Sequence, residues 1–83
     1  MDAYLVAQEA MARLKSAVRA TLENGPADGM TNVQIGKTLG IYAGHIGHVG
    51  HIPRTMLALL ESEGVVAQLE EGKKWVLIRH EDE

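Results

Sequence analysis

The chain has no cysteine, no phenylalanine and no excess of positive charge, and each of these absences narrows what the protein can be. Without cysteine it forms neither disulfides nor thiolate metal sites, which predicts an intracellular, cytoplasmic protein. Without phenylalanine its core must consist of aliphatic side chains and methionine, which an apolar content of 46% allows. No apolar run is as long as a membrane span, and the start lacks the pattern of a signal peptide. We therefore expect no membrane partner.

The net charge of −3 argues against a protein that attracts nucleic acid over its whole surface. Any contact with DNA would have to come from a local cluster of basic residues. A chain of 83 residues is too short for a second core, so we expect a single domain over 1–83. Its ordered part should cover about 3–78, and the polar, acidic residues 79–83 should form a tail.

The segment from Ile52 to Gly64 has the clearest secondary-structure signals and predicts a short helix. Pro53 suits the first helical turn, where a missing N–H costs nothing, and Gly64 suits the left-handed position after the end. At 100° per residue, one arc of this helix is apolar: Ile52, Met56, Leu57, Leu59 and Leu60. The opposite arc should face solvent: Arg54, Thr55, Ala58, Glu61 and Ser62.

Two further helices are predicted upstream. The first is capped by Asp2 and runs to about Glu23. Its buried stripe is predicted to be Tyr4, Ala7, Met11, Leu14, Val18 and Leu22. The second begins with a capping box between Thr31 and Gln34 and ends at Gly40, and Gly36 would let another helix approach closely.

A hairpin is predicted directly after Gly64, with arms over 65–69 and 74–78. If Glu71 and Gly72 form the tip, Ala67 lies opposite Val76 and Gln68 opposite Trp75. A three-residue tip with a bulge at Gly72 is an equal alternative. Met30 could add a one-strand stub between the first two helices, and Trp75 should cover the sheet at the edge of the core.

A repeat of glycine, histidine and an apolar residue runs three times between Gly44 and Ile52. Its three imidazoles could hold zinc or nickel, and the ligands would be His45, His48 and His51. In an α-helix, however, the first and third would lie about 120° apart around the axis, which suits one shared ion poorly. The alternative is a glycine-rich turn without a metal, which is the reading we adopt. No catalytic motif is present either, so we expect neither enzymatic activity nor a cofactor.

Residues 3–78 resemble a winged helix-turn-helix domain, an α+β fold of three helices followed by a two-stranded β-hairpin wing. The resemblance rests on 31–40 as the second helix, on 56–66 as the third helix entering the wing, and on 70–77 as wing and last strand. These segments are similar to bacterial transcriptional regulators, and to the small winged helix appended to some type II restriction endonucleases. The enlarged Gly-His turn and the single basic residue of the third helix depart from that pattern.

This resemblance implies a small bacterial DNA-binding regulator of transcription. The residues that would contact double-stranded DNA are Lys37, Arg54, Thr55, Ala58, Lys73 and Lys74. So few contacts imply weak binding by a monomer, and therefore a homodimer or a larger protein partner. The alternative implied by the same fold is a module for protein–protein interaction, which the acidic charge favours.

Overall fold

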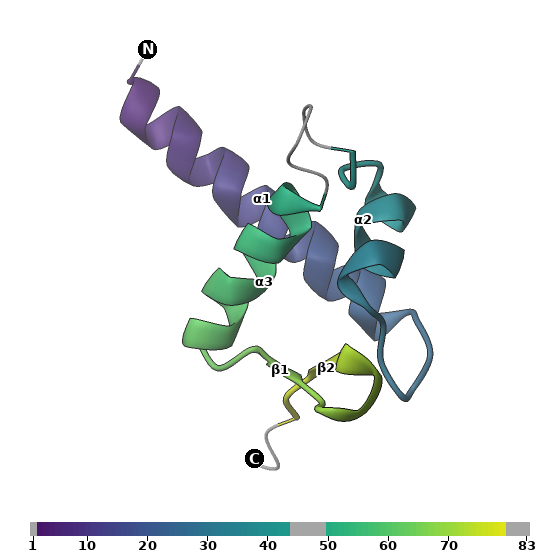
Figure 1. Ribbon diagram of the computed structural model, residues 1–83. Helices are drawn as coiled ribbons and strands as arrows, with labels where there is room; N and C mark the ends of the chain where they lie inside the picture. The colour runs from purple at the N-terminus through teal and green to yellow at the C-terminus, as the bar shows by residue number, and fades with distance from the viewer. Residues whose placement is uncertain (1, 44–49, 80–83) are drawn as a thin grey trace.

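The computed structural model describes residues 2–43 and 50–79, and these residues form three helices followed by a two-stranded antiparallel hairpin (Figure 1). A single turn of 3₁₀ helix, η1, separates the two strands. The elements in chain order are α1 (Ala3–Glu23), α2 (Asn32–Leu39), α3 (His51–Ser62), β1 (Val66–Gln68), η1 (Glu71–Lys73) and β2 (Trp75–Leu77). This is the expected α+β arrangement, with the helices before the hairpin.

Helix α1 begins where its sequence signal predicts, because the Asp2 carboxylate accepts hydrogen bonds from the Tyr4 and Leu5 N–H groups. Val18 and Leu22 are buried, as expected from their spacing. The prediction that Tyr4 and Ala7 are also buried was wrong: Tyr4 is 69% exposed and Ala7 is exposed as well. Their spacing continues the core stripe, but α1 extends beyond the elements that cover its C-terminal half (Figure 1).

Helices α2 and α3 pack closely because one position between them has no side chain. A Cβ atom on Gly36 would lie 2.9 Å from Tyr42 Cβ and 3.0 Å from Pro53 Cγ, so any larger residue would push α3 away. The predicted capping box of α2 is present, with Thr31 and Gln34 exchanging side-chain and backbone hydrogen bonds. Gly40 ends the helix with φ 74°, a left-handed value that glycine adopts without strain.

Helix α3 supplies the centre of the core. Met56, Leu57 and Leu60 are buried, while Leu59 and Ile52 are half-buried, which confirms the predicted apolar arc. Gly64 has the expected left-handed conformation, with φ 77°. The buried apolar side chains of the described residues form one cluster that all three helices and both strands share: Val18, Leu22, Met30, Ile35, Met56, Leu57, Leu60, Val66 and Trp75.

The hairpin has the predicted register, with Ala67 opposite Val76 and Gln68 opposite Trp75. Its tip is longer than either predicted turn. The Leu69 N–H donates to the Lys74 carbonyl at 2.7 Å, so residues 70–73 form a four-residue connection. Gly72 (φ 76°) and Lys73 (φ 54°) both take left-handed conformations there, which reverses the chain without a two-residue turn.

Two contacts fasten the hairpin to the loop between α1 and α2. Met30 and Trp75 form an antiparallel bridge, with N–H···O distances of 3.0 and 2.7 Å, which confirms the expected stub. The Lys74 ammonium also lies 2.8 Å from an Asp28 carboxylate oxygen. The hydrogen bond from Lys74, together with the attraction of its charge, lowers the pKa of Asp28 below its ordinary value.

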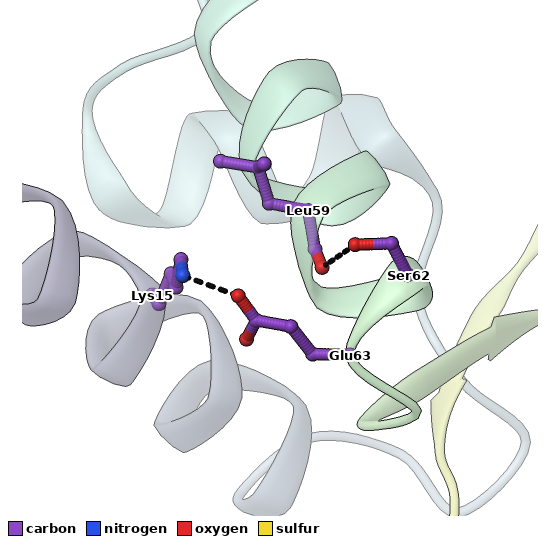
Figure 2. A network of polar contacts seen from close by, with 4 residues as sticks. All are labelled: Lys15, Leu59, Ser62 and Glu63. Carbon is purple, nitrogen blue, oxygen red and sulfur yellow. Dashed lines mark hydrogen bonds and ion pairs between the residues drawn. The ribbon is translucent and has the colours of Figure 1, made fainter.

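A third polar contact joins α1 to the C-terminal end of α3. Lys15 on α1 points toward Glu63, which follows the last turn of α3, and the two form an ion pair (Figure 2). In the same turn the Ser62 hydroxyl donates to the Leu59 carbonyl at 2.7 Å. The Lys15 pair neutralises one of the acidic residues beside the C-terminal end of α3.

Replacing Leu60 by alanine tests whether α3 and the hairpin share one core with α1. Leu60 is 3% exposed, so its truncation removes buried surface and leaves a cavity. We expect the free energy of unfolding to fall by about 2–5 kcal/mol, measured by urea denaturation. Leu59 is half-buried, so Leu59→Ala should cost less. A loss below about half a kcal/mol for Leu60→Ala would contradict the core described above.

The Lys74–Asp28 pair can be tested through the titration of Asp28. We expect the pKa of Asp28, followed by NMR, to lie below its ordinary value and to rise toward it in Lys74→Met. Any stabilisation from the pair is present near neutral pH and is lost as the pH falls through this depressed pKa. Lys73→Met is the matched control, since Lys73 is adjacent but belongs to none of the ion pairs found between described residues. An Asp28 pKa that is the same in Lys74→Met and the wild type would show that the pair does not form in solution.

Candidate nucleic-acid interface

The outer side of α3 presents three of the predicted DNA-contacting residues together. Arg54, Thr55 and Ala58 are all exposed, and they fall within about 100° of arc on the side opposite the buried leucines. The Thr55 hydroxyl donates to the His51 carbonyl at 3.0 Å. Its proton is therefore used within the helix, so Thr55 offers an outside ligand its methyl group and an oxygen acceptor.

The charge on α3 changes sign along its length. Arg54 lies in the first part of the helix, whereas Glu61 lies in the last turn and Glu63 directly after it. Both acids are exposed, but Glu63 is paired with Lys15, whereas Glu61 belongs to none of the ion pairs found between described residues. A polyanion would therefore meet the least repulsion at the N-terminal half of α3, where Arg54, Thr55 and Ala58 lie.

Lys37 lies on the exposed side of α2, the helix that packs beside α3. Its ammonium is 5.5 Å from the centre of the Tyr42 ring, within the range of a cation–π contact. An exposed contact of this kind is weak, and the ammonium keeps its hydrogen-bond donors for an outside acceptor.

The two lysines at the hairpin tip are not equivalent, which their adjacent positions in the sequence do not reveal. Lys73 is exposed and sits in a left-handed conformation at the end of η1. Lys74 is half-buried, and Asp28 holds its ammonium. A phosphate could reach Lys73 directly, but it would have to compete with a carboxylate for Lys74.

A short segment of chain connects the hairpin tip with the start of α3. Asp28 contacts Lys74, and four residues later the Asn32 amide donates to the Gly50 carbonyl, at 3.2 Å, directly before α3. Four residues span at most about 14 Å when fully extended. The Cα atoms of Asp28 and Asn32 are therefore within that distance of each other, so one short stretch of chain contacts both the hairpin tip and the residue before α3.

The histidine site predicted as the less favoured alternative lies largely outside the described residues, which do not include His45 and His48. His51 is exposed and is the first residue of α3. Over residues 2–43 and 50–79, no three side chains of histidine, cysteine, aspartate or glutamate come close enough to hold a metal ion. None of the helices in that part of the chain combines the length and apolar character needed to cross a bilayer.

The polar contacts that sequence reasoning missed join residues far apart in the chain. Lys74 and Asp28 are 46 positions apart, and Lys15 and Glu63 are 48 apart, so no local spacing could have suggested either pair. The bond from the Asn32 amide to the Gly50 carbonyl was also missed, and it spans 18 positions. A comparison of the chain with protein-family models, with curated proteins and with solved structures finds no match.

Proposed function

We propose that this chain is a winged-helix protein that binds double-stranded DNA, without catalytic activity, and acts as a small bacterial regulator of transcription. The observation that carries the proposal is the exposed cluster of Arg54, Thr55 and Ala58 at the beginning of α3. The side chains near the start of a recognition helix are those that contact base edges in helix-turn-helix proteins. The bridge between Met30 and Trp75 supports the same reading, since it pairs one residue before α2 with β2, where a one-strand stub is expected beside a wing.

The chemistry of these three side chains suggests what they would recognise. An arginine guanidinium donates two hydrogen bonds to guanine O6 and N7, and methyl groups of threonine and alanine contact the thymine methyl. Arg54 would therefore select a guanine, and Thr55 and Ala58 would favour neighbouring thymines. Lys37 and Lys73 are suited to phosphates on either side, because an ammonium is a flexible point charge without base specificity.

A second candidate function is a protein–protein interaction module, and the charge distribution favours it. The chain has a net charge of −3, and carboxylates already pair with the basic side chains of Arg13, Lys15 and Lys74. A partner protein would not need the counterion release that gives DNA-binding proteins most of their affinity. The two functions differ in their salt dependence.

A salt titration separates these functions. If Lys37 and Lys73 each neutralise one phosphate while Arg54 contacts a base, log K should fall against log salt with a slope of about −1.8, and of about −2.7 if Lys74 contributes as well. Lys73→Ala should make the slope about 0.9 units shallower and weaken binding to every sequence alike. The measurement is fluorescence anisotropy with mixed-sequence duplex DNA from low to moderate salt.

Lys74→Ala is the matched control for Lys73→Ala. Both variants remove one ammonium from the hairpin tip, but only Lys74 must leave a carboxylate to reach a phosphate. We therefore expect a smaller change of slope for Lys74→Ala. The absence of any wild-type binding at low salt, where attraction to a polyanion is strongest, would reject the DNA proposal and favour the interaction module.

Substitutions at Arg54 test base recognition separately from charge. Arg54→Lys keeps the positive charge but loses the two-pronged geometry, so the salt slope should persist while the preference for guanine declines. The expected loss of discrimination is about 1–3 kcal/mol for the preferred site over its mutated version, measured by competition with a randomised duplex library. An unchanged preference in both Arg54→Lys and Arg54→Ala would exclude Arg54 from base contact.

A further inference from the structure

The N-terminal part of α1 is an apolar helix end without a covering element among the described residues. Between Ala3 and Ala10 only Gln8 and Glu9 are polar, yet all eight residues are exposed. Tyr4, Leu5 and Val6 are the three most exposed large apolar side chains in the described part of the chain. Helical spacing places Val6 on the face of α1 that also carries Ala10 and Ala17, whereas Tyr4 and Leu5 lie about 160° and 100° away from that face.

One face of α1 extends from Val6, near the N-terminal end, to Ala20 in the C-terminal half. Val6, Ala10, Arg13, Ala17 and Ala20 recur every three or four residues, so they line up about 140° away from the buried stripe of Val18 and Leu22. A shallow depression lies at Val6, Glu9, Ala10 and Arg13. Farther along, Ala17 and Ala20 form one wall of an apolar hollow of about 580 Å³, and Thr38 and Leu39 of α2 form another.

We propose that this face of α1 binds the same face of a second copy of the chain, with the two α1 helices antiparallel. Val6 and Ala17 are eleven positions apart, about 16 Å along the helix. A twofold axis midway between them places Val6 of each copy opposite Ala17 of the other, and Ala3 opposite Ala20, so both lie at the mouth of the hollow. The same twofold rotation covers the hollow of both copies. A twofold dimer requires this, because each copy must present the same surface to the other.

The charges on this face fit the same arrangement. Glu9 and Arg13 lie on either side of the midpoint and pair within one helix at 2.8 Å, with 62% and 79% of their side chains exposed. Antiparallel packing brings Glu9 of each copy next to Arg13 of the other, so two pairs of opposite charge flank the axis. A parallel arrangement would instead set Glu9 beside Glu9 and Arg13 beside Arg13. The charges therefore select the antiparallel pairing.

The small residues of the face determine how closely the helices approach. Ala10, Ala17 and Ala20 have short side chains, which allow Val6 to enter the hollow rather than hold the helices apart. The paired surface is one helix wide, which is at the low end of interface sizes, so the dimer should be weak and concentration-dependent. This inference does not depend on DNA binding, and its test uses no DNA.

Sedimentation equilibrium of the chain from about 1 µM to 1 mM measures the association. We expect a monomer–dimer equilibrium in the wild type, and we expect Val6→Glu and Ala20→Glu each to raise the dissociation constant about a hundredfold. Each substitution places two carboxylates per dimer in an apolar contact without a partner. Both positions are exposed in the single chain, so the variants should keep the wild-type circular dichroism and melting temperature.

Val33→Glu is the matched control, because it makes the same change at an exposed helical valine on α2, away from this face. It should leave the dissociation constant within about twofold of the wild type. A charge swap tests the orientation: Glu9→Arg and Arg13→Glu should each weaken the dimer, and the double variant should restore it. A wild type that stays monomeric to 1 mM, or a dimer that Val6→Glu and Ala20→Glu leave intact, would overturn the proposal.

Discussion

The backbone bridge between Met30 and Trp75 is the constraint on which the rest of this small fold depends. It holds the hairpin against the loop between α1 and α2, and it buries the one tryptophan of the chain beside Met30 in the common core. The bridge also explains Gly29, whose φ is 96° and whose missing Cβ would lie 2.5 Å from the Trp75 carbonyl oxygen. A core without phenylalanine has few large side chains, so the position of Trp75 fixes how the strands sit on the helices.

The same anchoring decides which basic groups remain for an outside ligand. Once the bridge has set the hairpin on the loop, Lys74 lies against Asp28, while Lys73 at the end of η1 stays exposed. At the other end of this loop, the bond from Asn32 to Gly50 fixes the beginning of α3. The loop therefore positions two surfaces at once. An acidic chain can attract a polyanion only where such positioning brings exposed basic side chains together.

Sequence reasoning succeeded where the determinant is local. The caps at Asp2 and Thr31, the left-handed Gly40 and Gly64, and the hairpin register all depend on residues within a few positions of one another. The exposure of Arg54, Thr55 and Ala58 follows in the same way from helical periodicity.

Sequence reasoning failed where the burial of a residue depends on how far a neighbouring helix or strand extends. Tyr4 has the spacing of a core residue, but burial requires a neighbour, and the sequence of α1 does not say where its neighbours end. For the same reason the neutralisation of Lys74 by a residue 46 positions away could not be foreseen. The arrangement of the candidate interface thus depends on tertiary contacts. The exposure of its best-placed side chains depends only on local helical periodicity.

The proposed dimer through α1 would compensate for the small number of basic residues on the α3 side. On the proposed function, two or three phosphate contacts would give a monomer little affinity at physiological salt, because each contact would add only a modest, screened term. Two copies joined through α1 would bind as one unit, so the second copy would engage at a high effective concentration. The duplex would then have to present its two half-sites at the separation set by the twofold axis, and a site of any other spacing would bind only one copy. A weak dimer is sufficient for this, since DNA that holds both copies also favours their association by the same free energy.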